Sequence, residues 1–405
     1  MARAARIAQH GLAQRRSADK AAALHAAADA IRADAAAILA ANARDMAAAG
    51  DLSGALRDRL ALDDGRLAAM ADAIDHVATL PDPVGEIYDV RHRPNGLRLE
   101  RVRIPIGVIG MIYESRPNVT ADAAALCLMS GNAVLLRGGR EAGESNGAIH
   151  AAFVRGIKSA GFSADLVQRV ASPDRALVGD MLGASGLIDL IIPRGGKALV
   201  ARVAAEARVP TLAHLDGNNH IYVHAAADAG MARAICINAK MHRPGICGAV
   251  ETLLLDRDFT EGGALIRALL DAGCDVRGDA CVHAMDARVT AAVEDDWRTE
   301  YLRPIIAARQ VAGLAEAMAH IAAFGSGHSD AILTQDDAAA AQFLSSVDSA
   351  IVFHNASTIF ADGGEFGMGA EIGIATGRLH ARGPVALEGL TTHKWRVLGT
   401  GQVRG

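Results

Sequence analysis

Short apolar runs alternate with helical stretches between residues 104 and 224, and this alternation limits the possible folds more than any other feature of the sequence. IGVIGMI (106–112) and AVLLRG (133–138) are such apolar runs, and ESNGAIHAAFVRGIKSA (144–160) is a helical stretch between runs of this kind. Strands that alternate with helices form mostly parallel sheets whose faces the helices cover. The pattern therefore predicts an α/β fold.

The length of the chain predicts more than one domain. Its 405 residues exceed what one core usually holds, so two or three domains are expected. The first eighty residues are rich in alanine, with larger apolar residues at helical spacing. A second α/β block runs from about Asp228 to Gly373. It ends in STIFADGGEFGMGAEIG (357–373), a long loop of the kind that often lines a functional site.

A hairpin is expected just before the first α/β block. Residues 90–93 and 97–102 alternate apolar and charged side chains on either side of Pro94-Asn95-Gly96, which is a turn signal. An isolated two-stranded ribbon is marginal in water and needs something to pack on, for which a second chain is one candidate. The tail LTTHKWRVLGTG (390–401) is typical of one more short strand.

Charge and cysteine usage exclude several classes of protein. The net charge of −5 argues against an electrostatic nucleic-acid-binding surface. Five cysteines without a CxxC pair leave one unpaired, which suits a reducing cytosol. No stretch reaches eighteen apolar residues, and the N-terminus has no continuous apolar core of a secretory signal. We expect a cytoplasmic protein with neither a membrane nor a nucleic-acid partner.

Neither of the common phosphate-binding loops is present. No GxGxxG follows the early strands, and PRGGKAL (193–199) lacks the glycine spacing and the Ser/Thr of a P-loop. Gly195 and Gly196 nevertheless let backbone N–H groups approach a ligand, although a plain turn is the more frequent explanation for such glycines.

No metal site is expected from the spacing of histidines and cysteines. Cys274, Cys281 and His283 do not have zinc-ligand spacing. The histidines at 214, 220 and 224 alternate as in a strand, where histidines usually serve as hydrogen-bonding groups.

Cys247 lies between a glycine-containing turn and an apolar run typical of a buried strand, in AKMHRPGICGAVETLLL (239–255). A lone cysteine is most often a small buried apolar residue, and that explanation stays open here. Lys240, His242 and Arg243 precede it, and positive charge favours the thiolate over the thiol. Spacing alone makes Cys247 a candidate nucleophile and does not decide between this role and that of a buried apolar residue.

Together with several long stretches elsewhere, these residues resemble the gamma-glutamyl phosphate reductases of the aldehyde dehydrogenase superfamily. The resemblance covers essentially the whole chain in the family's order, although the chain departs from the family's usual residues at Asn218, Asn219, His242 and Gly248. The matching stretches besides AKMHRPGICGAVETLLL are RIPIGVIGMIYESRPNVTADAAALCLMSGNAVLLRGG, IDLIIPRGGKALV, HLDGNNHIYV, GSGHSDAILT and NASTIFADGGEFGMGAEIGI with LHARGP.

The resemblance implies an activity and its partners. It implies NADPH-dependent reduction of L-glutamyl 5-phosphate to L-glutamate 5-semialdehyde with release of phosphate, the second step of proline biosynthesis from glutamate. Cys247 would displace the phosphate and hold the acyl group as a thioester. The expected cofactor is NADP(H), and functional coupling to glutamate kinase is an expected partnership.

The resemblance also assigns roles to individual residues. Asn118, in SRPNVT, matches the side chain that stabilises the oxyanion together with a backbone N–H. Glu300 matches the carboxylate on the nicotinamide ribose, and Arg137 falls where a cation near the adenosine ribose would favour a 2′-phosphate. Gly195 and Gly196 are candidates for the cofactor, and Arg116 and Arg243 are candidates for the substrate's phosphate and carboxylate.

By the same resemblance the fold is aldehyde-dehydrogenase-like, with two Rossmann-like α/β domains and a β-ribbon oligomerisation element. Residues 1–88 and 104–216, with 379–388, would form the NADP-binding domain, and 217–378 the catalytic domain. Residues 89–103 and 389–405 would form the ribbon of a homo-oligomer, which leaves a dimer and a tetramer open.

Two rival functions remain. A general NAD(P)-dependent aldehyde dehydrogenase needs a base that activates water for deacylation, usually a glutamate, and His214 stands at the matching position. An inactive nucleotide-binding scaffold would have no preferentially reactive thiol at Cys247.

Overall fold

The chain folds into two compact units, each described here by itself. The computed structural model describes every residue except 51, 53 and 405. Contacts within the chain group Met1–Ala213, Met368–Gly373 and Val385–Gly405 into a first unit. They group His214–Gly367 and Ile374–Pro384 into a second unit.

The first unit is built on a four-stranded parallel sheet with the strand order β5-β4-β3-β6. Its strands are β3 (Val108–Tyr113), β4 (Ala133–Gly138), β5 (Val167–Arg169) and β6 (Leu190–Arg194). Its helices are α1 (Ala2–Leu12), α2 (Ser17–Ala33), α3 (Ala35–Ala48), α4 (Gly54–Leu60), α5 (Asp64–Thr79), α6 (Asn118–Met129), α7 (Gly143–Ser159), α8 (Ala176–Leu182) and α9 (Lys197–Glu206), with short 3₁₀ turns at Arg140–Ala142, Ala164–Leu166 and Glu388–Leu390.

Small residues let the alanine-rich helices of this unit approach closely. A side chain at Gly156, in α7, would come within 2.4 Å of the backbone of Ala26 and Ala27 in α2. This close approach of two helices is consistent with the composition of the chain, in which only 3% of the residues are bulky aromatic ones. The predicted amphipathic N-terminal helices and the strand–helix alternation are confirmed.

The second unit contains a seven-stranded parallel sheet in the order β10-β9-β11-β8-β7-β12-β13. Apolar clusters lie on either side of it: the successive residues Ile221 and Tyr222 of β7 belong to different clusters. The strands are β7 (Asn219–Val223), β8 (Val250–Asp256), β9 (Asp275–Gly278), β10 (Thr290–Ala291), β11 (Ile305–Val311), β12 (Ser329–Leu333) and β13 (Ile351–His354). The helices are α10 (Ala229–Met241), α11 (Gly262–Asp271), α12 (Ala280–His283), α13 (Leu314–Phe324) and α14 (Asp337–Ser346), with 3₁₀ turns at Glu294–Arg298 and Thr358–Phe360.

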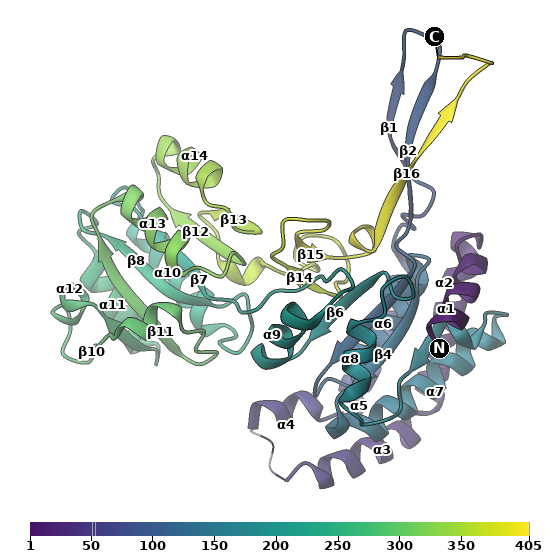
Figure 1. Ribbon diagram of the computed structural model, residues 1–405. Coiled ribbons are helices and arrows are strands. Elements are labelled where there is room, and N and C mark those ends of the chain that lie inside the picture. The colour runs from purple at the N-terminus through teal and green to yellow at the C-terminus, as the bar shows by residue number, and fades with distance from the viewer. Residues whose placement is uncertain (51, 53, 405) are drawn as a thin grey trace. The chain divides into compact units, whose positions relative to one another are not determined.

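The expected hairpin is present and the tail joins it. β1 (Ile87–His92) pairs antiparallel with β2 (Arg98–Pro105), and β16 (Thr391–Leu398) pairs with the other edge of β2. Figure 1 shows these strands extending away from the helices as a thin ribbon. Several of its apolar side chains are exposed, namely Ile87, Tyr88, Val90, Trp395, Val397 and Leu398. One further small sheet joins β14 (Gly373–Ala375) and β15 (Gly383–Val385).

The boundaries of the units differ slightly from the expected domains. The second unit begins at His214 rather than at residue 217, and residues 374–384 pack with it, although 379–388 were expected to accompany the first domain. The return segment of the chain thus changes units within β14 and again within β15. Among the described residues, no helix is both long and apolar enough to span a bilayer.

Candidate active site

Cys247 lies in the turn between α10 and β8 and is partly exposed. The other four thiols differ in their surroundings: Cys281 is exposed, and Cys127, Cys236 and Cys274 are buried. Burial raises the pKa of the Cys236 and Cys274 thiols to about 12 and raises that of Cys127 as well, so these three stay protonated and inert near neutral pH. Of the five, Cys247 alone combines partial exposure with a fixed position on a turn.

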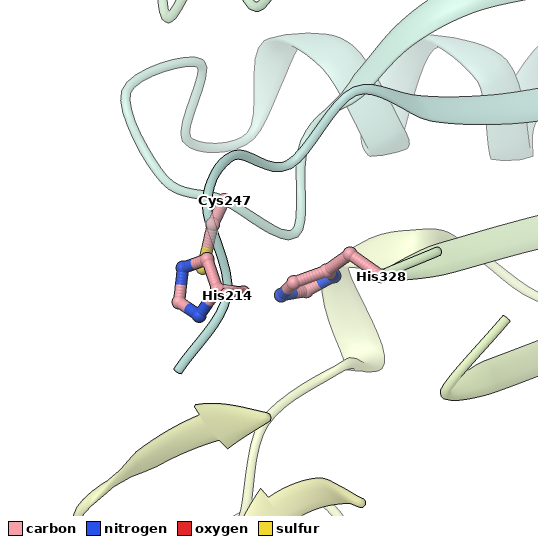
Figure 2. A group of neighbouring side chains, drawn as sticks. All are labelled: His214, Cys247 and His328. Atoms are coloured by element: carbon pink, nitrogen blue, oxygen red, sulfur yellow. The ribbon is translucent and has the colours of Figure 1, made fainter. Parts of the chain in front are cut away.

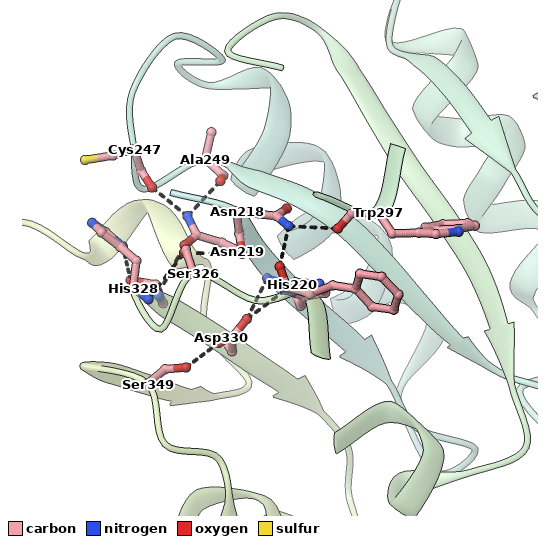
Figure 3. A network of polar contacts seen from close by, with 12 residues as sticks. Asn218, Asn219, His220, Cys247, Ala249, Trp297, Ser326, His328, Asp330 and Ser349 are labelled. Atoms are coloured by element: carbon pink, nitrogen blue, oxygen red, sulfur yellow. Dashed lines mark hydrogen bonds and ion pairs between the residues drawn. The ribbon is translucent and has the colours of Figure 1, made fainter. Parts of the chain in front are cut away.

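Asn219, the first residue of β7, holds this turn in place. Its side-chain NH₂ donates to the backbone carbonyls of Cys247 (2.6 Å) and Ala249 (2.8 Å), as Figure 3 shows. Its oxygen accepts from the N–H of Ser329 (3.1 Å). Asn219 is fully buried, so these bonds are shielded from water. A side chain at Gly217 would come within 2.2 Å of the Cys247 carbonyl oxygen, so only glycine permits this close approach.

The nucleophile candidate lies at the amino-terminal edge of the second sheet. Cys247 comes just before β8, Asn219 begins β7, and His328 comes just before β12. These three strands are parallel neighbours, so their first residues share one edge of the sheet. Sites of open parallel sheets more often lie at the carboxyl ends of strands, and no sequence pattern predicts the opposite edge.

The predicted basic surroundings of Cys247 are partly wrong. The Lys240 ammonium is fully buried and pairs with Glu251, on β8, at 2.5 Å. Burial raises the pKa of the Glu251 carboxyl to about 7, and the Lys240 charge opposes that rise. Lys240 is therefore committed to an internal ion pair. His242 and Arg243 are exposed on the turn.

Two histidines accompany the thiol. Ligand atoms of His214, Cys247 and His328 all lie within 4.8 Å of one another, and Figure 2 shows the three side chains gathered together. The two imidazole rings meet edge to face, with centroids 5.1 Å apart. His214 was singled out from the sequence for its position and His328 was not, because a histidine at the start of a buried strand has no sequence pattern that marks it.

Each imidazole is oriented by a bond at Nδ1. Nδ1 of His214 lies 2.8 Å from the carbonyl oxygen of Ile374, which can only accept, so Nδ1 carries the proton and Nε2 carries the lone pair. Nδ1 of His328 lies 2.8 Å from Oγ of Ser329. Nε2 of His328 is buried and has no hydrogen-bond partner among the described residues.

A polar network continues from the site into the core of the second unit. Both the N–H and Nδ1 of His220 contact one carboxylate oxygen of Asp330, at 2.8 and 3.1 Å, and Oγ of Ser349 donates to the other oxygen (Figure 3). Nδ2 of Asn218 donates to the carbonyls of Trp297 and Phe324, both at 2.9 Å. These buried bonds fix the strand ends on which the turn of Cys247 rests.

Glu300 also supports the turn. Its Oε1 accepts from the N–H of Gly217 at 2.9 Å, and Gly217 in turn lies against the backbone of Cys247. The carboxylate expected to hold ribose hydroxyls thus reaches the segment that borders the nucleophile candidate. A carboxylate has lone pairs for further acceptor bonds beyond this one.

In the first unit, the loop after β3 is held by carboxylates. Oε2 of Glu114 accepts from the N–H of Gly196 at 2.9 Å, and Oε1 of Glu141 accepts from the N–H and Oγ of Ser115 at 2.7 and 2.9 Å. Gly196 is the residue before α9, and a side chain at Gly195 would come within 2.5 Å of the Glu114 carboxylate. The backbone N–H at Gly196 therefore binds a negatively charged oxygen, here an internal one.

Asn118 begins α6 and is exposed. Its Nδ2 donates to the carboxyl of Asp122, one helical turn later, at 2.8 Å. Burial raises the pKa of Asp122 to about 6, and the bond from Asn118 opposes that rise. The bond orients the Asn118 side chain along its own helix, and the amide retains a second N–H for another acceptor.

Arg137 lies at the end of β4 and is 7% exposed. Its guanidinium donates to the carbonyls of Gly138 (2.5 Å), Pro173 (3.1 Å) and Asp174 (3.4 Å). Its Nε is buried without a partner among the described residues. The candidate substrate residue Arg116 is half-buried in the first unit, whereas Arg243 belongs to the second unit.

Comparison with known proteins shows the family to which this α/β protein belongs. The aldehyde dehydrogenase family model matches residues 1–272, about two thirds of the chain, and the chain belongs to that family. It is 63% identical to gamma-glutamyl phosphate reductase from Novosphingobium aromaticivorans, covering 100% of this chain and 96% of that one. It is 64% identical to the protein of the same name from Sphingopyxis alaskensis, covering 99% and 94%.

A solved structure agrees with these relatives. The crystal structure of gamma-glutamyl phosphate reductase from Thermotoga maritima superposes with a TM-score of 0.97 at 43% identity, and covers 100% of this chain and 99% of that one. The predicted α/β fold of the aldehyde dehydrogenase type, with parallel sheets in two domains and a small antiparallel sheet, is confirmed.

Proposed function

We propose that this chain is a gamma-glutamyl phosphate reductase, which reduces L-glutamyl 5-phosphate to L-glutamate 5-semialdehyde with release of phosphate, a step of proline biosynthesis. One observation carries the proposal: a partly exposed thiol stands on a rigid turn in a chain that matches reductases of this name over its whole length. A carboxylate is a poor hydride acceptor, whereas an acyl phosphate is activated for attack by a nucleophile.

In the proposed mechanism, the Cys247 thiolate attacks the acyl carbon of the substrate. The bond from that carbon to the phosphate oxygen breaks, phosphate leaves with its electron pair, and a thioester forms. Asn219 and Gly217 support this step because they fix the backbone from which the thiol projects. The free N–H of the Asn118 amide is the proposed donor to the developing oxyanion, and such a donor is typically worth roughly 3–4 kcal/mol.

A reductase of this family uses a nicotinamide cofactor, and the chain's own groups fit one. When bound, the cofactor supplies the hydride that reduces the acyl carbon. The N–H of Gly196 holds an anionic oxygen, which supports a role for Gly195 and Gly196 beside the cofactor's phosphates. The carboxylate of Glu300 is the proposed acceptor for ribose hydroxyls.

For NADP rather than NAD, the supporting group is Arg137. Its buried Nε has no partner among the described residues, so a 2′-phosphate oxygen would satisfy a donor that is otherwise left unpaired. Arg116 and Arg243 are the proposed cations for the substrate's phosphate and carboxylate. Parallel assays with NADPH and NADH on the wild type and Arg137→Gln test this preference, and loss of the preference in the variant is expected.

The alternative is a general aldehyde dehydrogenase that hydrolyses its thioester. His214 favours the reductase, because a histidine stands where a hydrolytic enzyme usually has the glutamate that activates water. Neutral imidazole can still act as a base, so the experiment must measure water against phosphate as the acyl acceptor.

The experiment runs the reaction backwards, with semialdehyde and NADP⁺. Steady turnover is expected only with inorganic phosphate, or with arsenate as its mimic, and at most one equivalent of NADPH per active site without either. His214→Glu is expected to raise the phosphate-independent rate, with His214→Gln as the matched neutral control. Sustained oxidation in phosphate-free buffer at a rate similar to that with phosphate would favour the hydrolytic enzyme. The forward assay supplies glutamyl phosphate through a glutamate kinase, which also tests coupling to that enzyme.

We also propose that the ribbon joins protomers of a cytoplasmic homo-oligomer. Its exposed Tyr88 and Trp395 are large apolar side chains on a ribbon that has little of its own to pack on. Deletion of the residues after Leu390 is expected to produce monomers by light scattering. An unchanged oligomer after this deletion removes the ribbon from the interface.

A further inference from the structure

The cluster of His214, Cys247 and His328 has the ligand types of a transition-metal site. Thiolate sulfur and imidazole nitrogen are the ligands that Zn²⁺ and related borderline cations prefer, whereas Mg²⁺ and Ca²⁺ prefer oxygen. The three ligand atoms lie within 4.8 Å of one another, and Figure 2 shows the His328 ring pointing toward the other two side chains. A tetrahedral zinc ion needs such atoms roughly 3.3–3.7 Å apart. Closure by about 1 Å is therefore required.

The second shell of a metal site is already in place. A histidine that binds a metal through Nε2 usually donates its Nδ1–H to a carbonyl, carboxylate or other oxygen, which fixes the ring and its tautomer. The Ile374 carbonyl does this for His214, and Ser329 Oγ lies at the same 2.8 Å from Nδ1 of His328. Both rings are thus held at Nδ1 by oxygens of the second unit.

His328 points to a ligand independently of the cluster. Its side chain is 0% exposed, and its Nε2 has no hydrogen-bond partner among the described residues. A buried nitrogen left without a partner costs about 1–3 kcal/mol. Coordination of a cation by the Nε2 lone pair removes this cost, and burial keeps competing water from the nitrogen.

We propose that Cys247, His214 and His328 bind one Zn²⁺ ion in a three-ligand site with a fourth position open to water or an anion. The Cys247 thiol loses its proton to solvent on binding, and both imidazoles bind in the neutral form, so no redox partner is involved. The small closure required is available through rotation of the partly exposed Cys247 side chain, while the backbone of the turn stays fixed.

A thiolate bound to zinc no longer has its lone pair available for an acyl phosphate. Zinc binding would therefore reversibly inhibit the proposed reaction. The metal site itself does not depend on any step of that reaction. Zinc also shields the same sulfur from alkylating and oxidising reagents, because these attack the free thiolate.

The test uses the full-length protein after treatment with a chelator and a reductant. Co²⁺ replaces Zn²⁺ as the probe, because thiolate-to-cobalt charge transfer and strong visible bands report a sulfur ligand in tetrahedral geometry. Zn²⁺ affinity is then measured by displacement of the cobalt. The variants are Cys247→Ser, His328→Ala and His328→Asn, with Cys281→Ser as the control for metal binding at an exposed thiol and His354→Ala as the control for loss of a histidine outside the cluster.

We expect one cobalt per chain with a charge-transfer band in the wild type, in Cys281→Ser and in His354→Ala. Cys247→Ser should lack the band, and the His328 variants should bind Zn²⁺ at least about 100-fold more weakly, since loss of even an outer-shell partner costs roughly 10–100-fold. Saturating Zn²⁺ should slow iodoacetamide labelling of Cys247 in the wild type, and the same zinc concentration should protect Cys247 less in the His328 variants.

Three results overturn the proposal: a band that persists in Cys247→Ser, a band that disappears in Cys281→Ser, or unchanged zinc affinity in both His328 variants that circular dichroism shows to be folded. Use of two His328 variants guards against one that fails to fold. These readouts involve neither substrate nor cofactor, so failure of the zinc site leaves the reductase assay informative, and failure of that assay leaves the zinc result informative.

Discussion

The loops that carry the proposed site residues are held differently in the two units. In the first unit, carboxylates of Glu114 and Glu141 accept from backbone N–H groups in loops at the carboxyl ends of strands. In the second unit, the neutral amide of Asn219 donates to backbone carbonyls at the amino ends of strands. An anionic ligand such as a phosphate can take the place of the Glu114 carboxylate as the acceptor of a backbone N–H. The buried Asn219 amide donates to two backbone carbonyls, and an anionic ligand does not compete for that role.

This difference indicates that the turn of Cys247 in the second unit is held more rigidly than the loop of the first unit. The turn that carries Cys247 is held by the buried neutral amide of Asn219, and the Glu300 carboxylate holds the adjoining Gly217, as suits the proposed nucleophile, which must keep its position. The loop of the first unit is held by carboxylates near the surface, as suits the anionic ligand proposed for it.

The largest expected effect is that of Cys247→Ser. A hydroxyl of similar size keeps the turn, but at neutral pH it is a far weaker nucleophile than a thiolate. The variant should fold normally and lose nearly all reductase activity in the coupled assay. If it keeps a tenth of the wild-type turnover, the thioester mechanism is wrong and the fixed turn needs another purpose.

Acid should weaken the second unit through His320. Burial lowers the pKa of His320 to about 3, so the folded form stays neutral while the unfolded form binds a proton below about pH 6.5. Stability conferred by this group is fully present above pH 6.5 and is lost progressively as the pH falls toward 3, by at most about 4 kcal/mol.

His320→Phe should flatten this pH dependence, because the ring packs among Trp297, Phe324 and His220 and a phenyl group does not titrate. The measurement is the midpoint of denaturant unfolding at pH 7 and pH 5, with hydrogen exchange to separate the units. His92→Phe, at an exposed strand position, is the control. An unchanged loss of stability between the two pH values contradicts the assignment.

A smaller effect is expected from reversing the polarity at Asn219. Asn219→Asp keeps the shape and the acceptor for Ser329 but faces two carbonyl oxygens with a carboxylate. The loss of two buried hydrogen bonds should cost about 3 kcal/mol of unfolding free energy. It should also slow iodoacetamide labelling of Cys247, because a negative charge near a thiol disfavours the thiolate. Unchanged stability and labelling would mean that the turn does not depend on this amide.

The smallest effect is expected from the reverse exchange in the first unit. Glu114→Gln keeps an oxygen for the N–H of Gly196, and that bond lies close to solvent, so the cost should stay below about 1 kcal/mol. Removal of the charge should instead tighten the binding of NADPH, measured by fluorescence titration. If Glu114→Gln lowers the free energy of unfolding as much as Asn219→Asp does, the proposed difference between the two units is wrong.

The sequence predicted the architecture more completely than the site. Strand–helix alternation locates β3, β4 and the central strands, and Pro94-Asn95-Gly96 locates the hairpin, because these are local patterns with a known period or turn geometry. Cys247 could be proposed as a nucleophile because a glycine-containing turn and a strand-like run flank it. The resemblance of the whole sequence to a family then indicated the activity.

The residues that hold the turn could not be found in this way. Asn219 begins β7, and His328 directly precedes the neighbouring strand β12. Both come near the turn of Cys247 only because of the order of strands in the sheet, and strand order is a non-local property. The pairing of Lys240 with Glu251 was missed for the same reason: a helix and the strand after it face each other only once the chain has folded back. The departure at Asn219 was visible from the sequence, but its purpose was not.

The ribbon joins strands that are synthesised at widely separated times. Its third strand, β16, is drawn from the end of the sequence, and the Arg396 guanidinium meets the buried Glu100 carboxylate 296 residues away at 2.5 Å. Nearly three hundred residues are synthesised between the two strands, so β2 waits with one edge unpaired until β16 has been made. If the ribbon joins protomers as proposed, partners are recruited only after β16 is in place, and a chain that stops before β16 should fold its helices yet stay a substrate for chaperones and proteases.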